Sequence, residues 1–180
     1  MKNTGSISLH QLFSPASVNL NLKSLDRESV LEELVTQIPE LKNQAEARQT
    51  LLRALHEREQ LHSTGIGDGI ALPHARNALV GLVDHPIIVF GRHPEGIAYG
   101  AIDSVPARLF FLLIAPTVTQ HLAMLARLSR LLRDPRLRQA GHRKAISRRS
   151  ISKCSVGPAR ANSDIILECE VSQSKIVAEQ

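Results

Sequence analysis

The sequence predicts an α/β fold (α+β in detail): a small mixed β-sheet flanked by helices on both faces, in a single domain. Three observations lead to this prediction. Short apolar runs rich in Ile, Val, Leu and Phe, bounded by Pro or Gly, are typical of buried strands. Other stretches repeat apolar residues at three- and four-residue steps, as amphipathic helices do. A chain of 180 residues that is 43% apolar and 22% charged can fill one core and hardly a second.

Two helices are expected in the first third of the chain. Between Asp26 and Ile38 the apolar residues recur at helical steps, and Pro39 ends the pattern. A second helical stretch runs from about Gln44 to Leu61 and has an outer side rich in Glu, Arg and His. The residues that we expect on its inner side are Ala47, Leu51, Leu55 and Leu61.

A glycine-rich segment and three strands follow. Residues 64–69 read TGIGDG, and three glycines each lose about 1 kcal/mol against Ala within a helix, so we expect a tight turn. Residues 70–73 form a short strand that Pro73 closes. Residues 86–90 and 108–115 are the other two apolar runs. The second of these is apolar at consecutive positions, which predicts a central strand covered on both faces.

The last predicted helix begins at Thr117 or Thr119 as N-cap and ends near Arg133. Its inner stripe consists of His121, Leu125, Leu128 and Leu132. We therefore expect a folded domain over residues 1–140. Residues 141–180 are basic and rich in Ser, with no helical or strand period, and we expect them to form a poorly ordered, irregular tail.

The formal net charge of +5 does not by itself indicate a nucleic-acid partner. Residues 1–134 carry 13 basic and 13 acidic side chains, whereas residues 135–163 carry eight basic side chains and no acidic one. The predicted domain is thus neutral and lacks a basic face that would steer a polyanion. Aromatic residues make up 3% of the chain, too few for platforms that stack bases. The basic segment is either a tether to a membrane or nucleic acid, or the damaged end of a gene.

The sequence contains no candidate for a membrane-spanning helix. Its longest apolar run, residues 109–115, has seven residues, against the roughly 20 that a span requires. The first residues lack the continuous apolar region of a secretory signal, so we expect a cytoplasmic protein. Cys154 and Cys169 have neither the number nor the spacing of a disulfide framework or a metal knuckle.

His74 is the first candidate for chemistry. It follows the glycine turn and the short strand, and Pro73 before it restricts where the imidazole can point. Near neutral pH a histidine can accept a phosphoryl group and give it up again. The glycine turn matches neither a P-loop nor a dinucleotide fingerprint, so a nucleotide fold is not indicated. The alternative is that His74 is an ordinary loop histidine, one of eight in the chain.

Two more residues can serve the same site. His121 lies in the first turn of its predicted helix, where the positive end of the dipole favours a bound anion, although it can equally be a packed residue. Arg58 lies six residues before Thr64 and can bring a fixed positive charge, or can be a solvated residue at the helix end. A metal site is not indicated by the remaining histidines that we considered: His56, His62, His85 and His93.

Residues 57–76, EREQLHSTGIGDGIALPHAR, resemble the signature of the type 2 IIA domain of the bacterial phosphoenolpyruvate-dependent phosphotransferase system. This family includes the fructose/mannitol and the nitrogen-regulatory IIA proteins. The resemblance extends from about residue 6 to residue 139 and includes AIDSVPARLFFLLIAP. It implies that His74 is the phosphorylated residue, and that His121 and Arg58 assist it. The parts of the turn that would support the phosphate loop are Ser63, Thr64, Gly65, Gly67 and Gly69.

The resemblance implies a phosphotransferase component that accepts phosphate from a phosphohistidine carrier protein and needs no metal or organic cofactor. The onward acceptor would be a cysteine of a IIB sugar component, or regulatory proteins would detect the phosphorylated state. The lack of a linked IIB or IIC domain in this sequence favours the nitrogen-regulatory members. The alternatives are a sugar-transport IIA component of the fructose/mannitol class and a non-catalytic regulator that binds partners around His74. Family members usually continue with a further helix where this sequence becomes irregular.

Overall fold

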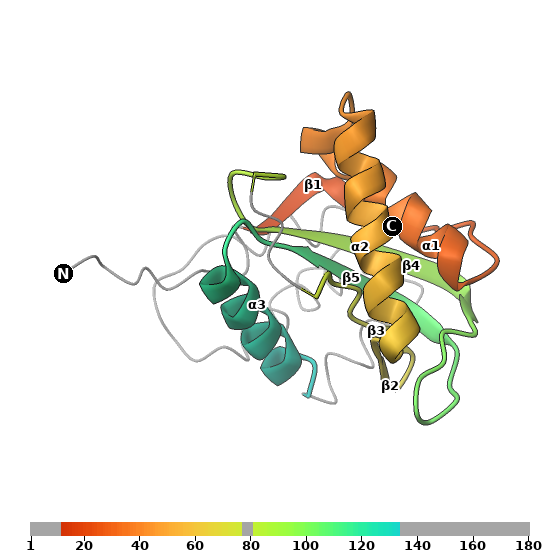
Figure 1. Ribbon diagram of the computed structural model, residues 1–180. Coiled ribbons are helices and arrows are strands. Elements are labelled where there is room, and N and C mark those ends of the chain that lie inside the picture. Colours follow the sequence, from red (N-terminus) through yellow and green to blue (C-terminus); the bar gives the residue numbers. More distant parts are fainter. Residues whose placement is uncertain (1–11, 77–80, 134–180) are drawn as a thin grey trace, which may run out of the picture.

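The computed structural model of the chain describes residues 12–76 and 81–133 (Figure 1). Five strands form one sheet in the order β1-β4-β5-β3-β2, and three α-helices and a short 3-10 helix accompany it within these ranges. The elements in chain order are β1 Phe13–Asn19, α1 Arg27–Thr36, η2 Pro39–Leu41, α2 Ala45–Leu61, β2 Gly65–Gly67, β3 Ile70–Ala71, β4 Ile87–Ile97, β5 Ala107–Ile114 and α3 Val118–Leu131.

The sheet is mixed, as the sequence predicts. Strands β4 and β5 pair antiparallel at its centre, with Phe90 opposite Phe111. Strand β1 runs parallel to β4, β3 runs parallel to β5, and β2 pairs antiparallel with β3 at the other edge. Strand β5 therefore has a neighbour on each side, which confirms the prediction that this apolar run is a central strand.

Two apolar clusters cover the two faces of the sheet. Successive side chains of a strand point to opposite faces, so a strand buried on both sides contributes to two cores. One cluster joins α1 and α2 to the side chains of Val89, Phe110 and Leu112. The other joins α3 to Ile88 and Leu113. Figure 1 shows α1 and α2 on one side of β4 and β5 and α3 on the other, which confirms the predicted layers.

The helices begin where their caps satisfy free backbone amides. The Asp26 carboxylate accepts a hydrogen bond from the Ser29 amide at 2.8 Å, and the Ser29 hydroxyl accepts one from the Asp26 amide, so the pair forms a capping box at the start of α1. At the start of α3 the cap is Thr117, whose hydroxyl accepts from the amide of Gln120. Of the two N-caps considered for this helix, the structure thus selects Thr117.

Strand β1 was not predicted from the sequence. Its residues include Pro15, Ser17 and Asn19, which hide the alternation typical of a strand. The pairing of β1 with β4 is irregular between Phe13 and Val18, and β1 lies at the edge of the sheet, where a proline is tolerated. The tertiary contact with β4, and not local propensity, makes this segment a strand.

The boundaries of two other segments differ from the prediction. Strand β4 continues beyond Phe90 to Ile97, although its last part contains Pro94 and Gly96. The His93 Nδ1 atom accepts hydrogen bonds from the amides of Glu95 and Gly96, which holds this irregular part together. The predicted tight turn at residues 64–69 contains strand β2, so only the connection to β3 is a turn.

One expected inward side chain was misplaced, and one buried side chain was missed. Leu61 is 50% exposed, because α2 ends there and the inner row of the helix passes through Leu51, Leu55 and Glu59 instead. On α3 Met124 is a buried position that the predicted stripe omitted, whereas Leu125 is partly buried and packs against the same core cluster. Both errors arose because the inner face of each helix was assigned from the spacing of apolar residues alone. The face that a helix buries also depends on the surface against which it packs.

No helix within residues 12–76 and 81–133 is long and apolar enough to cross a membrane. The predicted tail, residues 141–180, lies outside the described residues.

Candidate functional site

His74 is held against the central strand of the sheet. Its residue forms an isolated parallel bridge with Leu113 of β5, and the carbonyl of Pro73 accepts a hydrogen bond from the Leu113 amide at 2.9 Å. The side chain of His74 is half-buried. Pro73 and β5 together therefore place the imidazole at the surface end of a rigid element, as a reactive group requires.

A hydrogen bond determines which nitrogen of His74 carries the proton. The Nδ1 atom lies 2.7 Å from the carbonyl oxygen of Leu72. A carbonyl oxygen can only accept, so in the neutral ring Nδ1 is protonated and donates. The lone pair of the ring is consequently on Nε2, which becomes the nucleophilic atom.

His121 lies beside His74 although it comes from a different layer of the fold. It is a buried residue near the start of α3, and the centroids of the two rings are 5.5 Å apart with an angle of 48° between their planes. The sequence prediction named both residues, and the structure brings them together. The start of α3 also directs the positive end of its dipole toward this region.

Both imidazoles have a lowered pKa, which favours the neutral ring. Burial lowers the pKa of His74 below its usual 6.5, and the charge of Arg58 lowers it further, against the opposite effects of the Leu72 hydrogen bond and Glu59. Burial likewise lowers the pKa of His121, and His74 adds to this effect. A neutral ring keeps the lone pair that a nucleophile needs.

Arg58 is the third predicted residue at the site. It lies in the last turn of α2, and its Nη1 atom donates a hydrogen bond to the carbonyl of His62 at 2.8 Å. Its charge is one of the causes that lower the pKa of His74. The structure thus brings His74 and His121 into ring contact, and Arg58 acts on His74 through its charge.

The glycine-rich segment has a demanding backbone. A Cβ on Gly65 would lie 2.9 Å from the Cβ of Ala101, so only glycine fits without a shift. Gly67 and Gly69 have φ values of +91° and +72°, which favour glycine. The Ser63 hydroxyl donates to the carbonyl of Tyr99 and accepts from the amide of Gly65.

Three amides of this segment are already engaged within the protein. The amide of Thr64 donates to the Glu59 carboxylate, that of Gly65 to the Ser63 hydroxyl, and that of Asp68 to the Asp103 carboxylate at 2.7 Å. These amides are not free to bind phosphate. Ser63, Thr64 and Gly65 can therefore support the site by fixing its shape rather than by donating to an anion.

Glu59 is a residue of this region that the sequence interpretation missed. It is 5% exposed and accepts hydrogen bonds from the amide and the hydroxyl of Thr64. A signal was available, because Glu59 follows Leu51 and Leu55 at steps of four and so continues the inner face of α2. A carboxylate on an apolar face needs a structural explanation.

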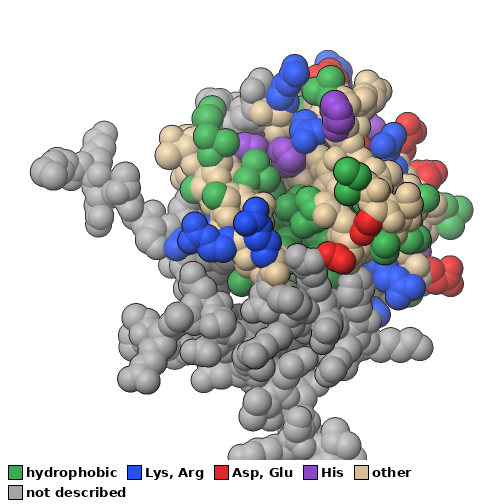
Figure 2. Space-filling model, turned by 90° about the horizontal axis from the view of Figure 1, so that it is seen from below, with side chains coloured by type: hydrophobic (Ala, Val, Ile, Leu, Met, Phe, Trp, Pro, Cys, Tyr) green, Lys and Arg blue, Asp and Glu red, His purple; other side chains and the backbone are tan. Residues whose placement is uncertain are grey.

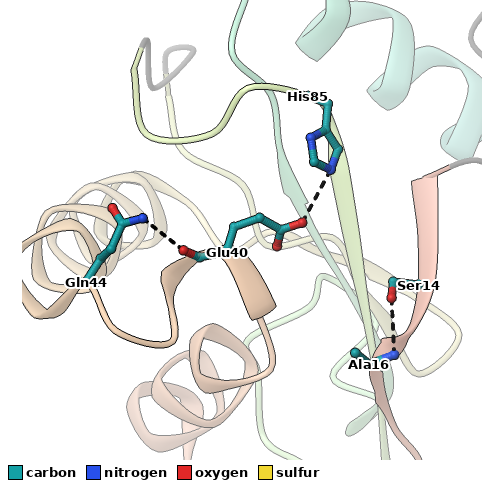
Figure 3. Close-up of polar contacts among 5 residues, drawn as sticks. All are labelled: Ser14, Ala16, Glu40, Gln44 and His85. Carbon is teal, nitrogen blue, oxygen red and sulfur yellow. Dashed lines mark hydrogen bonds and ion pairs between the residues drawn. The ribbon is translucent and has the colours of Figure 1, made fainter.

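Two other histidines have contacts elsewhere in the described part of the chain. His85 is largely exposed, and its Nε2 atom lies 3.3 Å from the carboxylate of Glu40 in η2 (Figure 3). His93 stabilises the end of β4. Among the residues described, no three His, Cys, Asp or Glu side chains are grouped so that they could hold a metal ion.

Histidine and basic side chains lie close together on one face of the molecule (Figure 2). Figure 2 shows histidine side chains beside Lys or Arg side chains on this face, next to hydrophobic ones. Together with the geometry above, the fold and the site define a small α/β domain in which two imidazoles of lowered pKa lie in contact and a guanidinium acts on one of them through its charge. This combination suits the reversible binding of a phosphoryl group.

The family follows from comparison with known sequences. The family model described as the phosphoenolpyruvate-dependent sugar phosphotransferase system, EIIA 2, matches residues 11–147. The chain therefore belongs to this family, whose members are phosphotransfer components.

Related sequences come from both branches of the family. The fructose-specific EIIABC component of Bacillus subtilis is 36% identical over 135 residues, which are 74% of this chain and 21% of that protein. The fructose-specific EIIA component of Haloferax volcanii is 39% identical over 51% of this chain and 59% of its own length. The chain thus spans about a fifth of the first relative and three fifths of the second. A nitrogen regulatory protein of Bradyrhizobium diazoefficiens is 34% identical over 68% of this chain and 78% of that protein.

Solved structures have the same fold. The nitrogen regulatory protein IIA-Ntr of Neisseria meningitidis superposes with a TM-score of 0.69 at 25% identity and covers 80% of this chain and 96% of that one. The IIA component for mannitol of Escherichia coli, in complex with phosphorylated IIB, gives a TM-score of 0.63 at 20% identity, with 89% and 97% coverage. The second comparison concerns the fold alone.

Proposed function

We propose that this chain is a phosphoryl-relay protein in which the Nε2 atom of His74 accepts phosphate from a phosphohistidine carrier protein. The observation that carries the proposal is the hydrogen bond from His74 Nδ1 to the Leu72 carbonyl, at 2.7 Å. It leaves Nε2 unprotonated in a ring whose pKa is lowered. A histidine with a fixed tautomer beside a second imidazole and a guanidinium suits phosphoryl transfer.

The transfer step can be written with balanced bonds. The Nε2 lone pair of His74 attacks the phosphorus atom of the donor in line, a new P–N bond forms, and the P–N bond of the donor breaks with its electron pair staying on the donor imidazole. The Nδ1 proton of His74 remains in place, and the Leu72 carbonyl stabilises the positive charge that then develops on the ring. A charged phosphohistidine ring is also a good leaving group for the next transfer.

His121 and Arg58 assist without accepting phosphate. In the transition state the negative charge is spread over the equatorial oxygens of the phosphoryl group. A neutral His121 can donate one N–H to these oxygens, and the Arg58 guanidinium supplies a permanent positive charge. Ser63, Thr64, Gly65, Gly67 and Gly69 keep the neighbouring backbone in place.

The nitrogen-regulatory branch is our first choice for the physiological role. The similarity to the Bradyrhizobium protein, over 78% of that protein's length, and to the Neisseria structure supports it. In this role regulatory proteins detect whether His74 is phosphorylated. The similarity to the Bacillus fructose-specific component favours a second candidate, in which phosphate moves on to a IIB component.

Reconstitution of the relay tests these proposals. The chain is incubated with labelled phosphoenolpyruvate, the general phosphotransfer enzyme and the carrier protein, and acid-labile label is measured. Rapid incorporation at one equivalent per chain is expected, and its absence would leave only a non-catalytic regulator that binds partners. A fructose or mannitol IIB domain is then added: loss of label to IIB supports sugar transport, whereas retention supports the regulatory role.

A further inference from the structure

The buried carboxylate of Glu59 is unexplained by the transfer step above. It is 5% exposed and lies at the end of the inner row of α2, after Leu51 and Leu55. Burying a carboxylate is expensive unless hydrogen bonds compensate for the lost water. Here both of its oxygens accept from one residue, Thr64: Oε1 from the amide at 2.7 Å and Oε2 from the hydroxyl at 2.6 Å.

Hydrogen bonds lead continuously from Glu59 to the reactive imidazole. The carbonyl of Thr64 accepts from the amide of Leu72 at 3.0 Å. The carbonyl of Leu72 accepts from Nδ1 of His74 at 2.7 Å. Glu59 thus fixes Thr64, Thr64 fixes Leu72, and Leu72 holds the ring. Each link is a direct contact, so the series couples α2 to the catalytic histidine.

The segment before His74 is fixed on two sides. On one side Thr64 holds the Leu72 amide, and on the other side Leu113 of β5 donates to the Pro73 carbonyl at 2.9 Å. The contact with β5 depends on the sheet. The contact with Thr64 continues the β2–β3 ladder, in which Gly65 pairs with Ala71. Glu59 connects this end of the ladder to α2 through the amide and the hydroxyl of Thr64.

We propose that Glu59 is a positioning residue that keeps His74 in the Nδ1-protonated tautomer, with Nε2 free, through Thr64 and Leu72. The inference rests on the proposed function, since it explains how the acceptor nitrogen of His74 is kept available. Glu59 itself does not touch the phosphoryl group. Without it, the Leu72 carbonyl is held by the sheet contacts alone, and the ring can adopt the other tautomer, in which Nε2 is protonated and not nucleophilic.

The test compares substitutions that keep or remove the hydrogen bonds of Glu59. Glu59→Gln keeps an acceptor for the Thr64 amide and offers an N–H to its hydroxyl. Glu59→Leu removes both contacts at similar volume. Thr64→Val removes only the hydroxyl contact and provides a second disruption if Glu59→Leu does not fold. Glu57→Gln is the matched control, because Glu57 is exposed on the same helix.

The first readout is the ring tautomer of His74, measured by ¹⁵N NMR on the full chain at pH 8, where the neutral ring dominates. We expect the Nδ1–H form in wild type, Glu57→Gln and Glu59→Gln. We expect a mixture containing the Nε2–H form in Glu59→Leu and a smaller change of the same kind in Thr64→Val. Glu59→Leu and Thr64→Val each lack a contact of Glu59. If the His74 tautomer is unchanged in whichever of these two variants folds, the inference is overturned.

The second readout is the single-turnover rate of phosphoryl uptake. Glu59→Leu should be slower by about 10- to 100-fold, the scale on which removing the partner that orients a histidine lowers activity at metal sites. Glu59→Gln should keep most of the wild-type rate, because it keeps hydrogen bonds to Thr64. A low rate in this variant would instead mean that the negative charge of Glu59 is needed. If wild type takes up no phosphate, the proposed function fails while the tautomer data still decide the role of Glu59. Normal uptake by a folded Glu59→Leu overturns the inference and leaves the proposed function intact.

Discussion

At the scale of single residues, the site depends on removing water from two imidazoles without removing their access to a partner. His74 is half-buried and His121 is buried, and burial is the main cause of the lowered pKa of each. Both effects favour the neutral ring. His74 can then act as a nucleophile through Nε2, and His121 can still donate one N–H to a developing charge. The division of roles follows from the Leu72 carbonyl, which holds His74 alone.

The first prediction is that His74→Ala abolishes phosphoryl uptake and leaves the domain folded. The change removes the nucleophile but no fully buried volume, because the side chain of His74 is half-buried. Acid-labile label and the urea midpoint of unfolding are measured side by side. His62→Ala, at an exposed histidine, is the control and should incorporate normally. Label on His74→Ala at wild-type stoichiometry would show that another residue is the acceptor.

The second prediction is that His121→Ala slows uptake by roughly 10²–10³, the effect of removing one transition-state donor, while uptake still reaches completion at long times. Quench-flow measurement of single turnovers gives the rate. Leu122→Ala is the matched control, because Leu122 is the next residue on α3 and is 59% exposed. Equal rates for His121→Ala and wild type would reduce His121 to a packing residue.

At the scale of elements, the connection between β2 and β3 is maintained by glycine conformation and one carboxylate. Asp103 accepts from the amides of Asp68 and Val105, so it ties this connection to the loop before β5. Gly67 leaves room for that carboxylate, since a Cβ there would lie 3.0 Å from the Asp103 Oδ2 atom. The shape of the segment that leads to His74 thus depends on a contact between two loops.

The third prediction concerns Gly67→Ala. A left-handed conformation costs a residue with a Cβ about 1–2 kcal/mol, and the clash with Asp103 adds to this loss of unfolding free energy. Gly81→Ala is the matched control, because Gly81 also has a positive φ, +81°, but no atom lies within 4 Å of its added Cβ. Urea unfolding of both variants gives the difference. Equal destabilisation by the two substitutions would mean that Asp103 moves aside freely.

At the scale of the whole molecule, the sheet carries a core on each face, and the site lies where the second core meets solvent. The cluster on the α3 side includes Leu72 and Leu113, the neighbours of the His74 segment, and Met124 and Leu128 below His121. The imidazoles therefore lose water because the core beneath them is packed. Folding and the ionisation of the site are linked for this reason.

The fourth prediction is that the domain loses stability as the pH falls through about 6.5, the ordinary pKa of histidine, and below it. In the folded state the pKa values of His74 and His121 are lowered from 6.5, so unfolded rings bind protons that folded rings do not, and stability rises with pH in this range. Glu33, whose pKa is lowered by hydrogen bonds from Ser24 and Lys23 against the effect of burial, acts in the same direction but below its usual 4.5. Urea unfolding between pH 5.5 and 7.5 measures the slope. A variant with both histidines replaced by Ala should show a shallower slope, and an identical slope would contradict the linkage.

The fifth prediction comes from the sequence and concerns residues 141–180, which lie outside the described residues. The basic, irregular composition predicts early cleavage by trypsin after Arg143, Lys144, Arg148 and Arg149. Limited digestion followed by mass determination should leave a fragment of about residues 1–140 that still accepts phosphate. Protection of Arg148 and Arg149 would instead move the domain boundary beyond them.

Much of the fold and the outline of the site could be predicted because helices and central strands leave local periodic signals. The steps of three and four from Val30 to Val35 and the apolar run of β5 depend on residues close in the chain. His74 and Arg58 stand out for the same reason, since they flank a glycine segment with few conformational options. These properties would be present in an isolated peptide.

Only the tertiary structure decided which residues and elements lie next to each other. β1 is a strand only because β4 offers it a partner, and Leu61 is exposed because α2 ends beyond the surface that it covers. The 5.5 Å separation of His74 and His121, and the burial of Glu59 behind Thr64, likewise depend on packing between layers. Desolvation and hydrogen bonding are set by neighbours that are distant in sequence, so no local pattern encodes them.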